Sequence, residues 1–292
     1  MAALTGNTVA STYKDLLQVS NSNSGIDATA RAISDGEGTA GLLYLSTTDV
    51  YSPGTGGTSN TAFGKDAGDV LAAGGNYNSL FGELSGHAIT TGDDNVAVGY
   101  EALTTCITGV RNTAVGRGSL RLSTGSYNTA VGWECLNNSA AASNNVAMGV
   151  YAMRQNITGE DSVGIGYSAL KGNTTGNYNT GVGRDSLFTN QTASYNTAVG
   201  YYALRLSTTA ASNVAMGYRT MYANTTGTEN TGLGEKAMHS NTTGSYNVAI
   251  GTRSLHNNTT SRNNTAFGYK SLYSNTGGGN LVAIGMGALY SN

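Results

Sequence analysis

One five-residue pattern of polar and apolar positions repeats along most of the chain. It reads Asn, Thr or Val, Ala or Gly, a larger apolar residue, and Gly, with clear copies at Asn196, Asn213 and Asn230. Copies follow one another at seventeen residues, except for one interval of eighteen and one of sixteen. Such regularity predicts a short structural unit stacked many times. The closing glycines are Gly64, Gly82, Gly99, Gly116, Gly132, Gly149, Gly166, Gly183, Gly200, Gly217, Gly234, Gly251, Gly268 and Gly285.

A second apolar position follows each closing Gly by four residues. It holds Leu or Met in twelve copies, and Gly68 and Gly86 replace it in the first two. Helical repeats need about thirty or more residues per unit, so a repeat this short and rich in Gly, Asn and Thr leaves room only for short strands and turns. The sequence therefore predicts an all-β fold, a parallel β-solenoid of about fourteen 17-residue coils. With about 4.8 Å between coils, the shaft would be roughly 65 Å long.

Alternation along a strand predicts which side chains share a face. The second and fourth positions of the pattern lie on one face, and the Asn, Ala or Gly, and closing Gly lie on the other. We expect the apolar pair to fill the coil and the Asn residues to stack in amide ladders.

The Ala/Gly face would then be bare, which indicates that another chain packs against it. The alternative is that these small residues line a narrow corner of one solenoid. The predicted trimer contact comprises Ala114, Gly116, Ala130, Gly132, Gly181, Gly183, Ala198, Gly200, Ala215 and Gly217.

The first part of the chain follows a different pattern. Residues 27–52 contain two β-like stretches around the turn formers Asp35, Gly36 and Gly38, which predicts a hairpin. The only proline, Pro53, opens the stretch PGTGGTSN, whose composition is typical of a linker. We therefore expect an N-terminal segment, residues 1–55, and a repeat shaft, residues 56–292.

Composition and charge narrow the class of protein. Only 11% of the residues are charged, 42 are Gly, and the net charge is −2, so no basic field favours a nucleic-acid partner. No apolar run approaches the roughly 20 residues of a membrane span, so we expect no membrane insertion. The N-terminus shows no cationic segment followed by an apolar core, and we expect no conventional secretory signal.

Few residues indicate chemistry. Cys106 and Cys135 fall two coils apart, too far for a disulfide, so we expect free thiols, as is usual for assembly in a reducing cytoplasm. His239 and His256 occupy equivalent positions in adjacent coils and should stack about 5 Å apart, either as exposed histidines or as a shared metal site.

Two acidic pairs precede copies of the pattern, Asp93 with Asp94 and Glu160 with Asp161. They are either solvated turn carboxylates or ligands of calcium. No Gly-x-Ser-x-Gly motif, phosphate loop or isolated carboxylate pair stands out, and we expect no enzyme, no cofactor and no bound metal.

Aromatic residues form a column just after the closing Gly. Such rings can grip a glycan, or they can stabilise the ladder by packing on one another. Tyrosines also recur in the residue preceding the pattern, as at Tyr178 and Tyr195. The candidate glycan contacts are Tyr100, Trp133, Tyr167, Tyr201, Tyr218 and Tyr269.

The repeats resemble those of known fibrous proteins. From Asn128 to Asn292 they resemble the repeats of bacteriophage tail fibres and tailspikes. The stretches NVAIG at Asn247 and LVAIG at Leu281 are similar to the head repeats of trimeric autotransporter adhesins. The leader, TGNTVASTYKDLL onward, resembles N-terminal segments of virion fibre proteins of podovirus-like phages.

The resemblance implies an elongated homotrimer with a left-handed parallel β-roll. It implies a virion fibre, assembled in the host cytoplasm, whose N-terminus attaches to other tail or neck proteins of the particle. The shaft would then be presented to a glycan or protein of the host surface. The alternative is a bacterial trimeric adhesin or another extracellular filament protein; an adhesin of that kind needs a signal peptide and a C-terminal membrane anchor.

Overall fold

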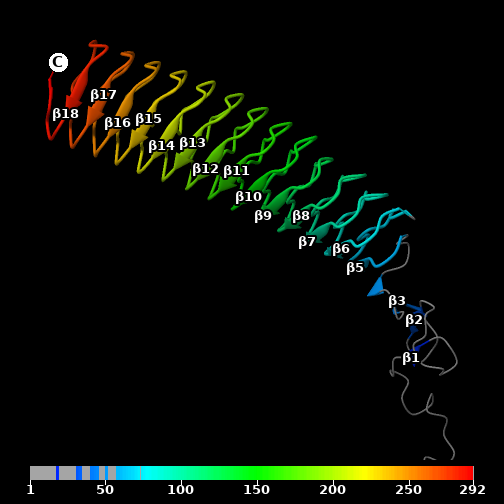
Figure 1. Ribbon diagram of the computed structural model, residues 1–292. Helices are drawn as coiled ribbons and strands as arrows, with labels where there is room; N and C mark the ends of the chain where they lie inside the picture. The colour runs from blue at the N-terminus through cyan, green and yellow to red at the C-terminus, as the bar shows by residue number, and fades with distance from the viewer. Residues whose placement is uncertain are drawn as a thin grey trace, which may run out of the picture.

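The computed structural model describes residues 18–19, 31–34, 40–45, 50–51, 57–72 and 74–291. From residue 57 onward the chain forms a gently curved rod of stacked coils, with fourteen short parallel strands side by side along its length (Figure 1). The predicted all-β parallel solenoid is therefore confirmed. The strands are β5 (Thr61–Phe63), β6 (Ser79–Phe81), β7 (Val96–Val98), β8 (Thr113–Val115), β9 (Thr129–Val131), β10 (Val146–Met148), β11 (Val163–Ile165), β12 (Thr180–Val182), β13 (Thr197–Val199), β14 (Val214–Met216), β15 (Thr231–Leu233), β16 (Val248–Ile250), β17 (Thr265–Phe267) and β18 (Val282–Ile284).

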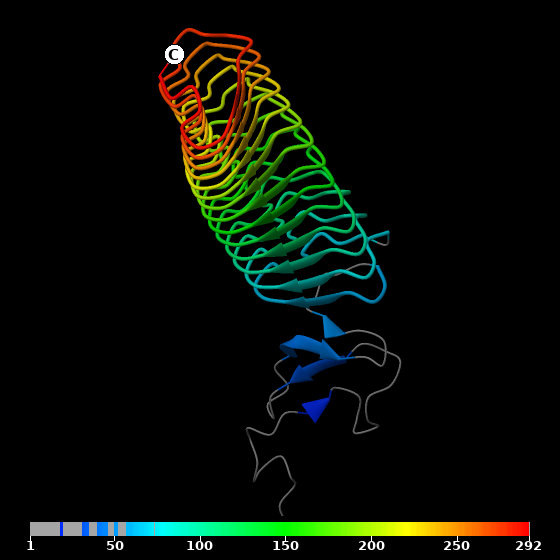
Figure 2. The ribbon, with the colours of Figure 1, turned by 60° about the vertical axis from the view of Figure 1, so that its left-hand side comes forward.

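Each coil bonds to the next in strict register. Ala198 of β13 lies opposite Ala215 of β14, and the same correspondence holds from β5 to β18. Backbone hydrogen bonds continue around the turns, as from the Leu170 N–H to the Ser186 carbonyl at 2.9 Å. In an oblique view the coils follow one another along the rod with similar outlines (Figure 2). Because each coil bonds only to its neighbours, the buried residues form one column along the length of the rod.

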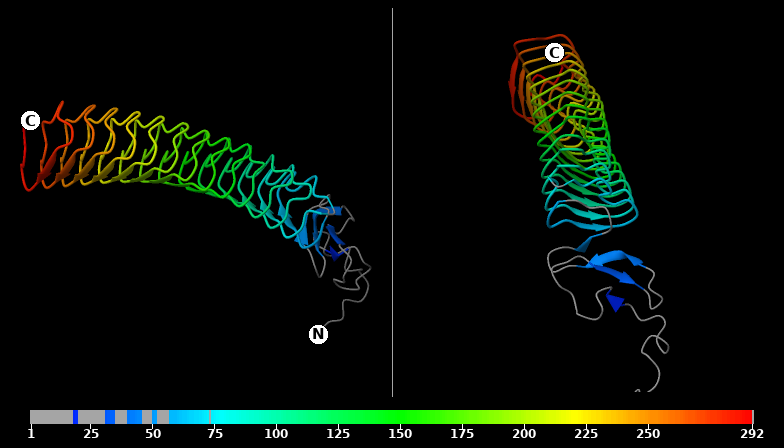
Figure 3. Two further views of the ribbon diagram at one scale, coloured as in Figure 1. Left: turned by 45° about the horizontal axis from the view of Figure 1, so that its top comes forward. Right: turned by 90° about the vertical axis from the view of Figure 1, so that its right-hand side faces the viewer.

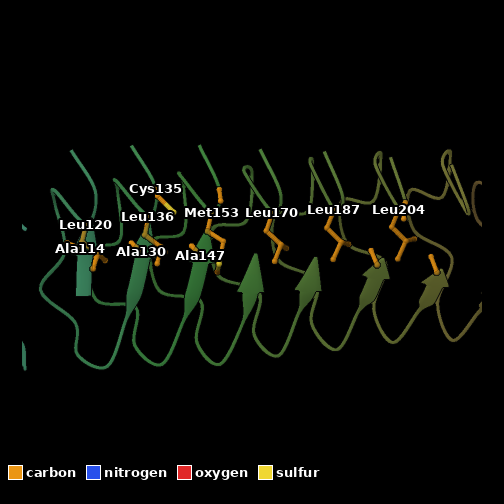
Figure 4. Close-up of a cluster of buried hydrophobic side chains, with 14 of the residues drawn as sticks. Ala114, Leu120, Ala130, Cys135, Leu136, Ala147, Met153, Leu170, Leu187 and Leu204 are labelled. Carbon is orange, nitrogen blue, oxygen red and sulfur yellow. The ribbon is translucent and has the colours of Figure 1, made fainter. Parts of the chain in front are cut away.

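The interior is built from the strand face opposite to the predicted one. Ala198 and its equivalents at the third position are fully buried, whereas the second and fourth positions are half-exposed or exposed. Leu187 and Leu204, from the turn after each strand, lie in the same interior column as these alanines (Figure 4). A narrow coil holds one large side chain per layer, and a second one from the strand would overpack it. Ala or Gly therefore occupies the third position wherever Leu or Met fills the interior, and Leu80 takes it in β6, where Gly86 replaces that Leu or Met.

The four alanines and Gly181, which were predicted to contact other chains, are instead buried inside one coil, as the alternative interpretation had it. Where Gly181 replaces Ala, a Cβ would lie 3.2 Å from Leu170 Cγ. The closing Gly183 has φ +122°, and a Cβ there would lie 2.7 Å from the Gly200 carbonyl oxygen of the next coil. The predicted contact between chains is therefore wrong for Ala114, Ala130, Ala198, Ala215 and Gly181, which lie inside the coil. The closing glycines Gly116, Gly132, Gly183, Gly200 and Gly217 are half-buried, and their contact with another chain stays a prediction.

The two exceptions to the Leu/Met column have a structural reason. The position is left-handed in every coil, with φ +59° at Gly68 and +58° at Gly86, so Gly adopts it without strain. Interior volume comes instead from Leu71, Leu80 and Ile89, and a Cβ at Gly68 would lie 2.8 Å from both Leu71 Cδ1 and Leu80 Cδ1. In the first two coils, these side chains therefore fill the interior space that Leu or Met fills in the later coils.

The predicted ladder of pattern asparagines is confirmed. The Asn196 Oδ1 accepts hydrogen bonds from the Asn213 backbone N–H at 3.0 Å and from Asn213 Nδ2 at 3.2 Å. The Asn196 Nδ2 donates to the Ala210 carbonyl at 2.8 Å. These amides are fully buried, so the bonds satisfy polar groups that water cannot reach.

A second amide ladder lies seven residues after the closing Gly, at a position for which the sequence predicted no ladder. Asn173 Nδ2 donates to Asn156 Oδ1, and Asn190 Nδ2 donates to Asn173 Oδ1, both at 2.8 Å. The ladder stops at Ser207 and resumes from Asn224 onward. Asn190 Oδ1 and Ser207 Oγ are both buried without a hydrogen-bond partner.

Four short strands precede the solenoid, namely β1 (Gln18–Val19), β2 (Arg31–Ser34), β3 (Ala40–Leu45) and β4 (Val50–Tyr51). Strands β1 to β4 pair antiparallel in sequence order, and β4 joins the solenoid in parallel at β5 (Figure 3). Strands β2 and β3 are the arms expected of the hairpin. Its turn formers, and the linker at Pro53, lie outside the described residues.

Candidate functional surfaces

An apolar stripe runs along the outside of the parallel strands. Its fourth-position members are apolar in every coil, and Met148, Met216 and Phe267 are 46%, 44% and 52% exposed. Six of its second-position members are Val, and the others are Thr or Ser. We call the following residues the outward stripe: Thr61, Phe63, Ser79, Phe81, Val96, Val98, Thr113, Val115, Thr129, Val131, Val146, Met148, Val163, Ile165, Thr180, Val182, Thr197, Val199, Val214, Met216, Thr231, Leu233, Val248, Ile250, Thr265, Phe267, Val282 and Ile284.

The six aromatic residues predicted to contact glycans each come two residues after the last stripe residue of their coil. Tyr201 stacks on Tyr218 with ring centroids 5.6 Å apart and an interplanar angle of 14°. Trp133 and Tyr167 both contact Tyr151, and the guanidinium of Arg117 lies over Tyr100. All six predicted residues remain exposed, so the structure shows packing partners for these rings and leaves glycan contact as a prediction.

A longer aromatic column lies five residues after the closing Gly. Tyr222, His239, His256, Tyr273 and Tyr290 stack in five consecutive coils, with neighbouring ring centroids 5.0–5.4 Å apart. The interplanar angles are 6–19°, so each ring covers the faces of its neighbours. Tyr222, His239, His256 and Tyr273 are half-buried, and Tyr290 is exposed.

A cation two residues after the closing Gly accompanies the column in four of its five coils, and Lys270 also lies beside Tyr290 of the fifth coil. Arg205 occupies the column itself, with its guanidinium 5.0 Å from the Phe188 ring centroid and 6.0 Å from that of Tyr222. Arg219 lies 5.3–5.7 Å from three tyrosine rings, and Lys270 lies 5.3–6.0 Å from three others. We call the following residues the basic–aromatic ridge: Arg205, Arg219, Tyr222, Lys236, His239, Arg253, His256, Lys270, Tyr273 and Tyr290.

The predicted histidine stack lies within this ridge. His239 and His256 have ring centroids 5.2 Å apart, as their spacing indicated. Burial, then His256 and the cations Arg219 and Lys236, lower the pKa of His239 to about 4. The pKa of His256 is also lowered, chiefly by burial. Both rings are therefore neutral near pH 7.

The two acidic pairs considered as calcium ligands differ in their contacts. Asp93 Oδ1 accepts the Asn76 backbone N–H at 2.7 Å, and Asp94 pairs with Arg111 at 3.5 Å. Glu160 and Asp161 form hydrogen bonds through their backbone N–H groups, which donate to Asn177 Oδ1 and to the Ser143 carbonyl. Across the described residues, no group of three or more His, Cys, Asp or Glu could hold a metal ion.

Both cysteines are buried free thiols, as expected. Burial raises the pKa of Cys106 to about 11 and that of Cys135 to about 12. Thiolate is the reactive form, so neither sulfur is poised for nucleophilic or redox chemistry.

A hollow of about 310 Å³ opens beside Phe188, next to the N-terminal end of the ridge. Lys171 and the side chains of Gln155, Thr174, Thr189 and Gln191 line the rest of it. The hollow thus combines one apolar ring with amide, hydroxyl and ammonium groups.

The sequence analysis missed the basic–aromatic ridge. Its signal was present, because Arg219, Lys236, Arg253 and Lys270 follow one another at seventeen residues, two after the closing Gly. Aligning every column of the repeat, and not only the strict ones, would have found it.

Comparisons with known proteins add no relative: no family model, curated protein or solved structure matches the chain. In the part of the chain that the structure describes, no helix has the length and apolar character to cross a membrane.

Proposed function

We propose that the chain is a structural shaft that assembles with copies of itself through the outward stripe. The observation that carries this proposal is the continuity of the stripe, which presents a large apolar residue in each of fourteen coils. Contiguous exposed apolar surface of this extent is unusual on a monomer and marks an interaction site. The trimer prediction is kept, with its contact moved from the Ala/Gly face to the opposite one.

A second copy is the partner that best fits this surface. The stripe repeats once per coil, at a rise of about 4.8 Å, so a partner must repeat at the same rise to match it layer by layer. Another copy of the chain does so in every layer. Cyclic symmetry then covers the stripe on all copies and closes the assembly, and the number three follows from the resemblance to trimeric fibres.

The biological setting follows from the same resemblance. We propose a bacteriophage fibre in which residues 1–55 attach to tail or neck proteins of the particle. The coils hold the rest of the fibre toward the host surface, since a solenoid is a spacer whose length changes by whole coils. Neutral imidazoles, buried thiols and the absence of a metal-binding cluster among the described residues give no support to an enzymatic role.

Light scattering of the purified protein tests the assembly. We expect three times the chain mass of 29.8 kDa. The double variant Ile165→Glu/Val199→Glu places two carboxylates on the outward stripe and should reduce the mass to that of a monomer. The control, Thr158→Glu/Thr192→Glu, adds the same charge at exposed turn positions with the same two-coil separation and should keep the wild-type mass. A monomeric wild type, or a folded double variant of unchanged mass, would refute the proposal.

A further inference from the structure

Charge is distributed unevenly along the rod. Residues 201–292 carry six Lys or Arg and two Asp or Glu, a net charge of +4. The first 200 residues carry nine basic and fifteen acidic residues, a net charge of −6. The net charge of −2 is therefore the sum of a basic C-terminal third and an acidic remainder.

The cations of this third are concentrated and nearly free of counter-charges. Arg205, Arg219, Lys236, Arg253 and Lys270 place one positive charge in each of five consecutive coils. Among the described residues the sole ion pair in this set joins Lys236 to Glu235, at 3.8 Å. By contrast, Arg111, Arg121 and Arg184 of the earlier coils all pair with carboxylates.

An in-register row of like charges destabilises the coils that hold it. Neighbouring cations repel at a coil rise of about 4.8 Å, and the adjacent rings offset only part of this repulsion through cation–π contacts. An anionic ligand lying along the row would neutralise it. The repeat makes the surface suitable for an extended polymer that carries regularly spaced negative groups.

The chemistry of the ridge distinguishes between anionic polymers. Single-stranded nucleic acids bind proteins by stacking bases on free aromatic faces, but here each ring of the column already stacks on its neighbours at 6–19°. The polar groups of these rings are the tyrosine hydroxyls and the imidazole nitrogens, which suit hydroxyl and carboxylate partners. The adjoining hollow adds the amides of Gln155 and Gln191 and the ammonium of Lys171 beside the Phe188 ring.

We propose that the basic–aromatic ridge binds an anionic polysaccharide, one that bears carboxylate or sulfate groups. This inference rests on the proposed function and names the chemical class that the shaft contacts at a host surface. It also moves the principal glycan contact from the column containing Tyr201 and Tyr218 to the adjacent ridge. Each coil contributes a weak contact, and repetition along the rod and across the copies multiplies them.

The test measures binding of the full chain to immobilised alginate, dextran sulfate, neutral dextran and a single-stranded oligodeoxynucleotide. The variant Arg219→Gln/Arg253→Gln/Lys270→Gln should bind alginate and dextran sulfate about tenfold more weakly than wild type. The control, Arg111→Gln/Arg121→Gln/Arg184→Gln, removes the same charge from ion-paired arginines and should stay within about twofold of wild type. Raising the salt concentration should weaken wild-type binding.

Each other result overturns the inference. Equal binding to neutral dextran would exclude recognition of charge, and tighter binding to the oligonucleotide would exclude a polysaccharide as the favoured ligand. An equal loss in both triple variants would show that net charge acts without the ridge, and failure to bind either anionic polymer would leave the ridge without this role. Light scattering on the same samples separates the two proposals: an intact oligomer that binds nothing refutes this inference alone, and a monomer refutes the shaft.

Discussion

Replacing Ser207 with Asn should stabilise the solenoid, because this serine interrupts the second amide ladder. In an unbroken stretch, each Nδ2 donates to the Oδ1 of the preceding coil and to a carbonyl three residues ahead, as Asn190 does to Asn173 Oδ1 and to the Ala193 carbonyl. At the break, Asn190 Oδ1 and Ser207 Oγ are buried without partners. Asn224 Nδ2 donates only to its own Gly227 carbonyl.

The Ser207→Asn side chain would close the gap with three hydrogen bonds. Its Nδ2 would donate to Asn190 Oδ1 and to the Ala210 carbonyl, and its Oδ1 would accept from Asn224 Nδ2. Space is available by analogy, since Asn190 has Ala193 where Ser207 has Ala210. An unsatisfied buried group costs about 1–3 kcal/mol, and side-chain ordering offsets part of the gain. We expect a net stabilisation of about 1–2 kcal/mol.

Thermal unfolding followed by circular dichroism measures the effect. For a chain of this size, about 1–2 kcal/mol corresponds to a rise in Tm of roughly 2–8 °C. The control Ser207→Ala removes the unpartnered hydroxyl but leaves Asn190 Oδ1 unsatisfied, so its Tm should stay near that of wild type. The reverse change, Asn173→Ser, makes a new break and should lower the Tm. The ladder argument fails if Ser207→Asn melts at or below Ser207→Ala.

Three further substitutions test the interior and the ridge. Gly183→Val should prevent folding of the central coils as seen by circular dichroism, because its Cβ would lie 2.7 Å from the Gly200 carbonyl oxygen; native-like melting would contradict this. Leu187→Ala removes a fully buried side chain and should cost about 2–5 kcal/mol in denaturant unfolding, and a loss below about 0.5 kcal/mol would mean that the coil has no packed interior. His239 has a folded-state pKa of about 4 against an ordinary 6.5, so the unfolded chain binds its proton more tightly and stability falls as the pH drops from 6.5 toward 4. His239→Gln should flatten that dependence, and an unchanged stability profile between pH 6.5 and 4 would contradict the assignment.

The sequence was sufficient to predict the solenoid, its parallel strands and the amide ladder of the pattern asparagines. All three depend on the interval of the repeat, which appears directly in the order of residues. Hydrophobicity alone does not predict which face of each strand points into the coil. Val199 is more apolar than Ala198, yet Ala198 is the buried one, because the width of the coil limits the size of the interior side chain and hydrophobicity does not.

The same limitation affects the prediction of the candidate surfaces, because they depend on which strand face points outward. With the faces reversed, the Ala/Gly residues were assigned to contact between chains and the outward stripe was assigned to the interior. The stacking of His239 on His256 was predictable because one interval of the repeat separates them. The cations beside them are harder to recognise in the sequence, because the ridge combines Arg, Lys, Tyr and His at two different positions of the repeat.

Oxidation of methionines in the native assembly tests the central claim most directly. Met148 and Met216 lie on the outward stripe and are 46% and 44% exposed in the single chain, whereas Met153 is fully buried and Met286 is 83% exposed. If other copies cover the stripe, brief treatment with hydrogen peroxide followed by mass spectrometry should find Met148 and Met216 protected like Met153, with Met286 converted to the sulfoxide. Oxidation of Met148 and Met216 as fast as that of Met286 would show that the stripe faces solvent and would contradict the account.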